Sequence, residues 1–129
     1  METMQAKDLY SFYGKSPVIQ GVSFDLEPGE FLAILGRNGV GKTTLLKSIM
    51  GLTDRCDGGL IFGEQDLLSR STSQRAKLGI AYIPQGRAII PNFTVRENIV
   101  MGTFARPDGK REIPDYLFEM FPILDEFIG

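Results

Sequence analysis

The order of apolar and polar positions predicts several short strands. Residues 9–13 are rich in aromatic side chains, and residues 22–26 alternate apolar and polar side chains, as a half-exposed strand does. Residues 31–35 are apolar at every position, which is typical of a strand buried on both faces. Further short strands are predicted over residues 60–62 and 79–83. Together these segments predict a small antiparallel sheet that leads into a parallel one.

Helices are predicted by apolar spacing and by capping signals. Residues 44–50 carry apolar side chains at helical spacing, and Gly51 is expected to end that helix. Thr94 and Glu97 have the spacing of a capping box, which predicts a helix from there to about residue 101. The remaining predictions are a loop over residues 53–59, a helix from about residue 73 and a helix over residues 115–121.

A glycine-rich motif lies between the strand predicted at 31–35 and the helix predicted at 44–50. It fits G-x-x-x-x-G-K-[ST] at every fixed position. Its glycines allow backbone torsions that bring N–H groups close to phosphate oxygens. Lys42 is expected to reach the β- and γ-phosphates of a nucleotide, and the Thr43 hydroxyl to bind Mg²⁺. The candidate nucleotide-binding residues here are Gly36, Arg37, Asn38, Gly39, Val40, Gly41, Lys42, Thr43 and Thr44.

The alternative for this motif is a glycine-rich turn that happens to precede a lysine. Four constrained positions and the strand–loop–helix context argue against that alternative.

Composition restricts the other possible functions. A formal charge of −2 gives no electrostatic reason to expect nucleic acid. The single cysteine, Cys56, excludes an internal disulfide, and the chain has no histidine to join it at a zinc site. No apolar run approaches the length of a membrane span. We expect a soluble intracellular protein without direct membrane insertion.

Three stretches around the motif resemble the ATP-binding subunits of ABC transporters. They are Tyr13-Gly14, residues 22–24 with 28–30, and residues 82–85, which are Tyr-Ile-Pro-Gln. The resemblance covers essentially the whole chain and implies ATP and Mg²⁺ as cofactors. It also implies a partial α/β fold of the P-loop nucleoside triphosphatase class, with an N-terminal antiparallel β-subdomain plus a parallel sheet with flanking helices.

The resemblance assigns roles to two further residues. In the family an aromatic ring at the position of Tyr13 stacks on adenine; the alternative is an aromatic packed in the sheet, and Tyr10 and Phe12 are neighbours with which it could be confused. Gln85 matches a glutamine that touches Mg²⁺ or its water and links the nucleotide site to the membrane subunits. The resemblance therefore implies Lys42 and Gln85 as catalytic residues, and Thr43 and Gln85 at the metal.

One segment resembles a particular subfamily. Residues 84–87, which are Pro-Gln-Gly-Arg, and residues 91–99 are similar to importers of branched-chain amino acids, amides and urea. In that family this segment receives the coupling helix of the membrane-spanning permease subunits. The contact residues implied are Arg87, Ile89, Ile90, Pro91 and Phe93; the alternative is that the apolar ones belong to the core. A second ATP-binding subunit and a place at the cytoplasmic face of the membrane are also implied.

The family's later motifs are absent. The chain contains no Leu-Ser-Gly-Gly-Gln signature, no Walker B strand and no switch histidine. Asp125 and Glu126 follow apolar residues as Walker B acids would, but Pro122 argues against a central strand there. We therefore expect residues 1–129 to be the N-terminal part of an ATP-binding domain, truncated before the signature, which binds nucleotide at most.

Two other classes of protein stay open at this stage. A soluble ABC ATPase of repair or translation would keep the fold, and a small-molecule kinase would keep only the phosphate loop. A GTPase is disfavoured because no Asn-Lys-x-Asp follows the loop.

Overall fold

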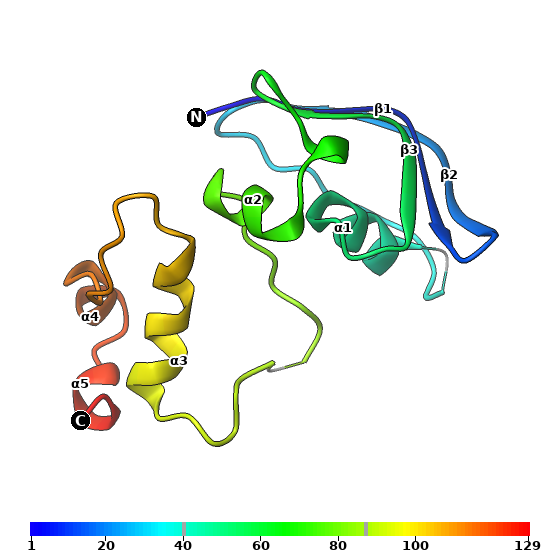
Figure 1. Ribbon diagram of the computed structural model, residues 1–129. Helices are drawn as coiled ribbons and strands as arrows, with labels where there is room; N and C mark the ends of the chain where they lie inside the picture. The colour runs from blue at the N-terminus through cyan, green and yellow to red at the C-terminus, as the bar shows by residue number, and fades with distance from the viewer. Residues whose placement is uncertain (40, 87) are drawn as a thin grey trace. The chain divides into compact units, whose positions relative to one another are not determined.

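The computed structural model describes residues 1–39, 41–86 and 88–129. The chain divides into two compact units, Met1–Tyr82 and Ile83–Gly129. Figure 1 shows that the first unit contains strands and helices, whereas the second contains helices and connecting loops.

The first unit is built on a four-stranded antiparallel sheet with the order β2-β1-β3-β4. β1 (Met4–Tyr13) and β2 (Ser16–Leu26) form a hairpin in which Tyr13 pairs with Ser16. β3 (Arg55–Phe62) pairs with the other edge of β1, and the short β4 (Gln65–Asp66) pairs with β3. The predicted antiparallel sheet is therefore confirmed, and its strands are longer than their sequence patterns indicate.

The loop predicted over residues 53–59 is wrong, because most of that segment belongs to β3. Gly58 and Gly59 weaken the strand pattern in the sequence. In the structure, Gly58 has φ +97°, and a Cβ atom there would lie 2.1 Å from the carbonyl oxygen of Asp8. Asp8 itself has φ +46°, and the pairing of β1 with β3 shifts register between Lys7 and Tyr10. The two strands thus meet at a bulge that requires glycine.

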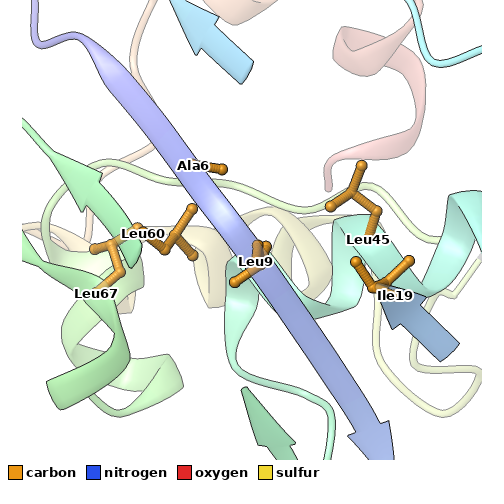
Figure 2. Close-up of a cluster of buried hydrophobic side chains, with 6 residues drawn as sticks. All are labelled: Ala6, Leu9, Ile19, Leu45, Leu60 and Leu67. Carbon is orange, nitrogen blue, oxygen red and sulfur yellow. The ribbon is translucent and has the colours of Figure 1, made fainter. Parts of the chain in front are cut away.

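A cluster of buried aliphatic side chains joins the sheet to its helices (Figure 2). α1 (Lys42–Met50) contributes Leu45 to this core, and the 3₁₀ helix η1 (Leu67–Ser69) contributes Leu67. The strand members are Ala6, Leu9, Ile19 and Leu60. α1 is therefore held on one face of the sheet by burial of its apolar side.

Both ends of the predicted helix at 44–50 are confirmed within two residues. α1 ends at Met50, and Gly51 follows in the left-handed region at φ +74°. The next helix, α2 (Thr72–Lys77), starts with a capping box between Ser71 and Gln74, one residue before the expected start.

The two apolar segments expected to form parallel strands do not form strands. Residues 31–35 and 79–83 have no ladder pairing, and no parallel pair exists among the residues that the structure describes. Phe31, Leu35 and Ile83 are almost fully exposed. A hairpin neighbour comes from adjacent sequence, whereas a parallel neighbour must come from a distant segment. Among the described residues neither segment pairs with a partner strand.

The second unit consists of short helices. They are α3 (Val95–Gly102), the 3₁₀ helix η2 (Thr103–Ala105), α4 (Tyr116–Met120) and α5 (Leu124–Phe127). The helix predicted over residues 115–121 corresponds to α4, and a further helical turn, α5, forms beyond Pro122. Asp125 and Glu126 lie exposed on α5, which agrees with the rejection of a Walker B strand there. No helix in the described parts of the chain has the length and apolar character needed to cross a membrane.

Candidate nucleotide-binding site

The glycine-rich loop leads directly into α1. Gly39 has φ +82° and Gly41 has φ +103°, a region that side chains with a Cβ rarely adopt. Gly41 is also the N-cap of α1. A Cβ atom on Gly41 would lie 3.0 Å from Cδ1 of Ile19, so β2 supports the loop from one side. The loop conformation therefore depends on glycine for both torsion and space.

The first turn of α1 has no capping side chain. The Gly41 carbonyl accepts a hydrogen bond from the Leu45 N–H at 2.8 Å, but among the described residues no side chain bonds to the N–H groups of the first turn. No acidic residue lies in that turn either. The positive end of the helix is left without an internal negative partner, which suits an anion such as phosphate.

The side chain of Lys42 folds back over the loop. Its Nζ atom donates a hydrogen bond of 2.5 Å to the carbonyl oxygen of Gly36. Lys42 is therefore held at the loop, where its ammonium group can bind a phosphate oxygen. The Thr43 side chain is exposed beside it.

A pocket of about 190 Å³ lies at the start of α1. Its lining residues are Val18, Asn38, Gly39, Gly41, Lys42, Thr43 and Thr44. Six of these lining residues were predicted from the glycine-rich motif, whereas Val18 comes from β2 and was not predicted. Its only signal is an apolar position just after the β1–β2 turn, and that position alone does not distinguish a ligand contact from a packed strand residue.

The structural features fit the triphosphate that the motif implies. Left-handed glycines, uncapped amides and a lysine surround one small pocket, and such a cradle binds phosphate oxygens. Thr43 offers a hydroxyl oxygen, a ligand type that Mg²⁺ accepts. Val40, another predicted residue of the loop, lies outside the described residues.

Tyr13 is the last residue of β1 and is 39% exposed. Its aromatic neighbours have other contacts: the Arg55 guanidinium lies 4.0 Å from the centre of the Phe12 ring, and the Tyr10 ring covers Gly21. Tyr13 does not line the pocket at α1. The exposed Tyr13 ring is accessible to a ligand, and its contact with adenine stays a prediction.

Gln85 lies in the second unit, at an exposed bend after Pro84. Its amide is accessible to solvent. The catalytic and metal-binding roles expected of Gln85 stay predictions.

The segment expected to contact a permease is exposed. Ile89, Ile90 and Phe93 are 61%, 37% and 41% exposed, and Pro91 is exposed as well. These side chains lie outside the buried core of the described residues, and their contact with a permease stays a prediction. Arg87, the remaining member of the set, lies outside the described residues.

Asn98 on α3 holds this segment, a contact that the sequence did not predict. Its Nδ2 donates to the carbonyl oxygens of Ile90, Phe93 and Thr94 at 3.2, 3.2 and 3.0 Å. Its Oδ1 accepts a 2.8 Å hydrogen bond from the Ile90 N–H. The carboxamide thus fixes the backbone that carries the apolar side chains.

The fold and the glycine-rich loop at α1 define a protein of the phosphate-loop nucleotide-binding class. The chain belongs to the ABC transporter family, because the sequence model of that family matches residues 19–126.

Curated relatives agree on the family and differ in cargo. The high-affinity branched-chain amino acid transport ATP-binding protein BraG of Pseudomonas aeruginosa is 32% identical over 90% of this chain and 50% of its own length. The sulfate/thiosulfate import ATP-binding protein CysA 2 of Rhizobium meliloti is 32% identical over 84% of this chain and 29% of its own length. The ribose import ATP-binding protein RbsA of Rhodococcus jostii is 36% identical over 80% of this chain and 20% of its own length. These identities do not separate the branched-chain subfamily from the others.

Two solved structures have the same fold. An ATP-binding subunit of an ABC transporter has a TM-score of 0.70 and 28% identity, over 95% of this chain and 49% of its own. A nucleotide-free ATP-binding cassette from an ABC transporter has a TM-score of 0.66 and 24% identity, over 97% of this chain and 53% of its own. The fold is therefore that of an ABC ATPase cassette, present in part. The chain spans at most about half the length of the relatives that it matches.

Proposed function

We propose that this chain provides the phosphate-binding part of an ATP-binding subunit that energises import by an ABC transporter. The observation that carries the proposal is the start of α1, where left-handed glycines and Lys42 surround a pocket and no side chain of residues 1–39, 41–86 or 88–129 caps the helix. Residues 1–129 then correspond to the part of the domain that precedes the signature motif.

Each residue of the site has a distinct role in this proposal. The loop amides and Lys42 bind the phosphates, since converging N–H groups and an ammonium group stabilise their charge. Thr43 and Gln85 bind the metal, and Tyr13 offers its ring to adenine. Val18 packs against the ligand from β2. Mg²⁺ neutralises phosphate charge when it is bound.

The proposed cargo is a branched-chain amino acid, an amide or urea. The match to BraG, which covers 90% of this chain, and the residues at 84–99 support this assignment. Growth on each cargo as sole nitrogen source, with and without the gene, tests it. Loss of growth on sulfate or ribose instead would contradict it.

The proposed partners are membrane-spanning permease subunits and a second ATP-binding subunit. The exposed apolar group of Ile89, Ile90, Pro91 and Phe93 supports contact with a permease, because a docking site needs accessible apolar surface. Arg87 is proposed to join it. The place of the protein is then the cytoplasmic face of the membrane, through these partners.

Nucleotide binding without rapid turnover is expected of this chain alone. The sequence offers neither a Walker B carboxylate for the metal nor the glutamate that polarises the attacking water. Positioning and charge stabilisation make up most of the catalysis of phosphoryl transfer. Hydrolysis at ordinary enzyme rates of roughly 1–10³ s⁻¹ that depended on Lys42 would contradict this expectation.

The decisive experiment is a calorimetric titration of the chain with MgATP. We expect Lys42→Ala to weaken binding at least about tenfold, because it removes a charge-assisted contact to phosphate. Lys47→Ala is the matched control, since Lys47 lies in the last turn of the same helix. Equal binding by the Lys42 variant and the unchanged chain would place the nucleotide elsewhere.

A further inference from the structure

A buried arginine lies at the end of α1 opposite the phosphate loop. Arg75 on α2 is only 4% exposed. Its Nη1 donates hydrogen bonds of 2.9 Å to the carbonyl oxygens of Ser48 and Ile49, and its Nε donates one of 3.0 Å to the carbonyl oxygen of Arg70. Two of the three acceptors belong to the last turn of α1. The side chain of one helix therefore caps the C-terminus of another.

The charge of Arg75 is met by helix carbonyls. The ion pairs found in the described part of the chain are Arg55–Asp57 and Arg106–Asp108, and neither includes Arg75. The C-terminal end of a helix carries partial negative charge, so a cation there is favoured. Burial lowers the pKa of the Arg75 guanidinium, and the nearby Cys56 and Asp66 oppose that shift. Moving the buried guanidinium away from the carbonyl oxygens of Ser48 and Ile49 would leave its charge without a partner, which is costly.

Gly51 leaves the space that the guanidinium occupies. It follows α1 with φ +74°, and a Cβ atom there would lie 2.9 Å from Cζ of Arg75. The Thr72 hydroxyl donates to the Gly51 carbonyl oxygen at 3.3 Å. The turn after α1 and the start of α2 are thus both shaped around the side chain of Arg75.

The backbone of Arg75 forms a second connection. Its carbonyl oxygen accepts hydrogen bonds from the N–H groups of Leu78 at 3.1 Å and Ile80 at 3.4 Å. Ile80 packs against the core cluster. The same residue therefore fixes the end of α1 with its side chain and the end of α2 with its backbone.

Because α1 is short, fixing one end of it also fixes the orientation of the other end. α1 has nine residues, which corresponds to a length of about 13 Å. Its first turn carries Lys42 and Thr43, and Ile19 supports the preceding Gly41. The direction of the helix is then set by β2 at one end and by Arg75 at the other.

We propose that Arg75 is a positioning residue for the nucleotide: by capping the last turn of α1 it orients the first turn, which carries the phosphate-binding groups. This inference rests on the proposed function of the phosphate loop. It assigns to Arg75 no contact with nucleotide.

The test compares Arg75→Gln and Arg75→Lys with Arg70→Gln in the whole chain. Arg70 is an exposed arginine on the same connection, so its variant removes the same charge without uncapping α1. We expect Arg75→Gln to weaken MgATP binding about tenfold, because it loses a charged donor to two carbonyls. Arg75→Lys keeps the charge and should restore part of the affinity. Arg70→Gln should bind like the unchanged chain.

A spectroscopic measurement separates positioning from general stability. In the nucleotide-free chain, Arg75→Gln should shift the amide NMR resonances of Gly39 and Gly41, a helix length away, at a temperature where the variant is fully folded. Unchanged resonances together with unchanged affinity would overturn the proposal. Failure of both Arg75 variants to fold would also overturn it, because Arg75 would then be a folding residue.

The same data distinguish the two proposals. If the unchanged chain does not bind MgATP, the proposed function fails, while the resonances of Gly39 and Gly41 still report whether Arg75 orients the loop. If the unchanged chain binds in a Lys42-dependent way and Arg75→Gln binds equally well, only the inference about Arg75 fails.

Discussion

Helices α1 and α3 begin in opposite ways. At α3, the Thr94 hydroxyl accepts a hydrogen bond from the Glu97 N–H at 3.2 Å, and the Glu97 carboxylate accepts one from the Thr94 N–H at 2.7 Å. At α1, the N-cap is a left-handed glycine, the first turn contains no acidic residue, and no side chain in the described part of the chain caps it. One helix start is closed by its own residues, and the other is open.

This difference distinguishes a helix start that only stabilises the fold from one that can bind an anion. Both helices leave N–H groups without partners inside the helix. α3 satisfies them locally and needs nothing from outside. α1 is completed only by water or by an anion, so part of the stability of its first turn is available to a ligand. A helix start without a capping side chain therefore indicates a binding site when, as at α3, residues that could cap a helix are otherwise used in the same chain.

The largest effect is expected from adding an acidic N-cap side chain to α1. Gly41→Asp adds a carboxylate at the start of α1, on a residue in the left-handed region whose new Cβ atom would lie 3.0 Å from Cδ1 of Ile19. We expect MgATP binding to fall by at least about a hundredfold in calorimetry, because charge repulsion adds to the loss of the cradle. Gly41→Ala is the control that carries the strain without the charge. ATP binding by the Asp variant at the unchanged affinity would remove the contrast between the helices.

A smaller effect is expected from removing the N-cap side chain of α3. Thr94→Ala removes the N-cap hydroxyl and should destabilise α3 by about 1 kcal/mol. Faster amide hydrogen exchange over residues 95–100 would show this loss. Thr94→Ser keeps the hydroxyl and should exchange like the unchanged chain. MgATP affinity should stay the same in both variants, and a large loss of affinity would mean that the two helix starts are not independent.

The smallest effect is a dependence on pH that only α3 should show. Hydrogen bonds from the backbone and the hydroxyl of Thr94 hold the pKa of Glu97 below its ordinary value of 4.5. The ionised carboxylate therefore stabilises folded α3 fully above pH 4.5, and this contribution is lost as the pH falls through the lowered pKa. Amide exchange over residues 95–100 should accelerate in that acidic range. Glu97→Gln should abolish the dependence, and α1 should lack it in either chain.

Local signals correctly predicted several elements of the chain. The glycine motif, the helix that follows it, Gly51 and the capping box at Thr94 each depend on residues within one or two turns of each other. The structure places α1 and α3 as those signals indicate. The strands predicted over residues 9–13 and 22–26, which lie in β1 and β2, rest on signals of the same local kind.

Features that depend on distant partners were missed or wrong. The apolar run at 31–35 predicts burial, but its side chains are buried only if other strands flank it. Only residues 60–62 of β3 were predicted as a strand, and residues 55–59 were missed because two glycines weaken the pattern of a strand that β1 holds in place. Arg75 resembles any charged residue of an exposed helix in the sequence, and only the structure shows what it caps.

The bulge between Asp8 and Gly58 limits how the chain can vary. Any side chain at position 58 would collide with the main chain of β1, so the strands could accept it only by separating or by sliding one residue. Sliding would turn Leu9 and Leu60, both fully buried, toward the opposite face of the sheet. Gly58 therefore fixes the register in which β1 and β3 pair. We expect saturation mutagenesis to find position 58 among the least tolerant positions outside the phosphate loop.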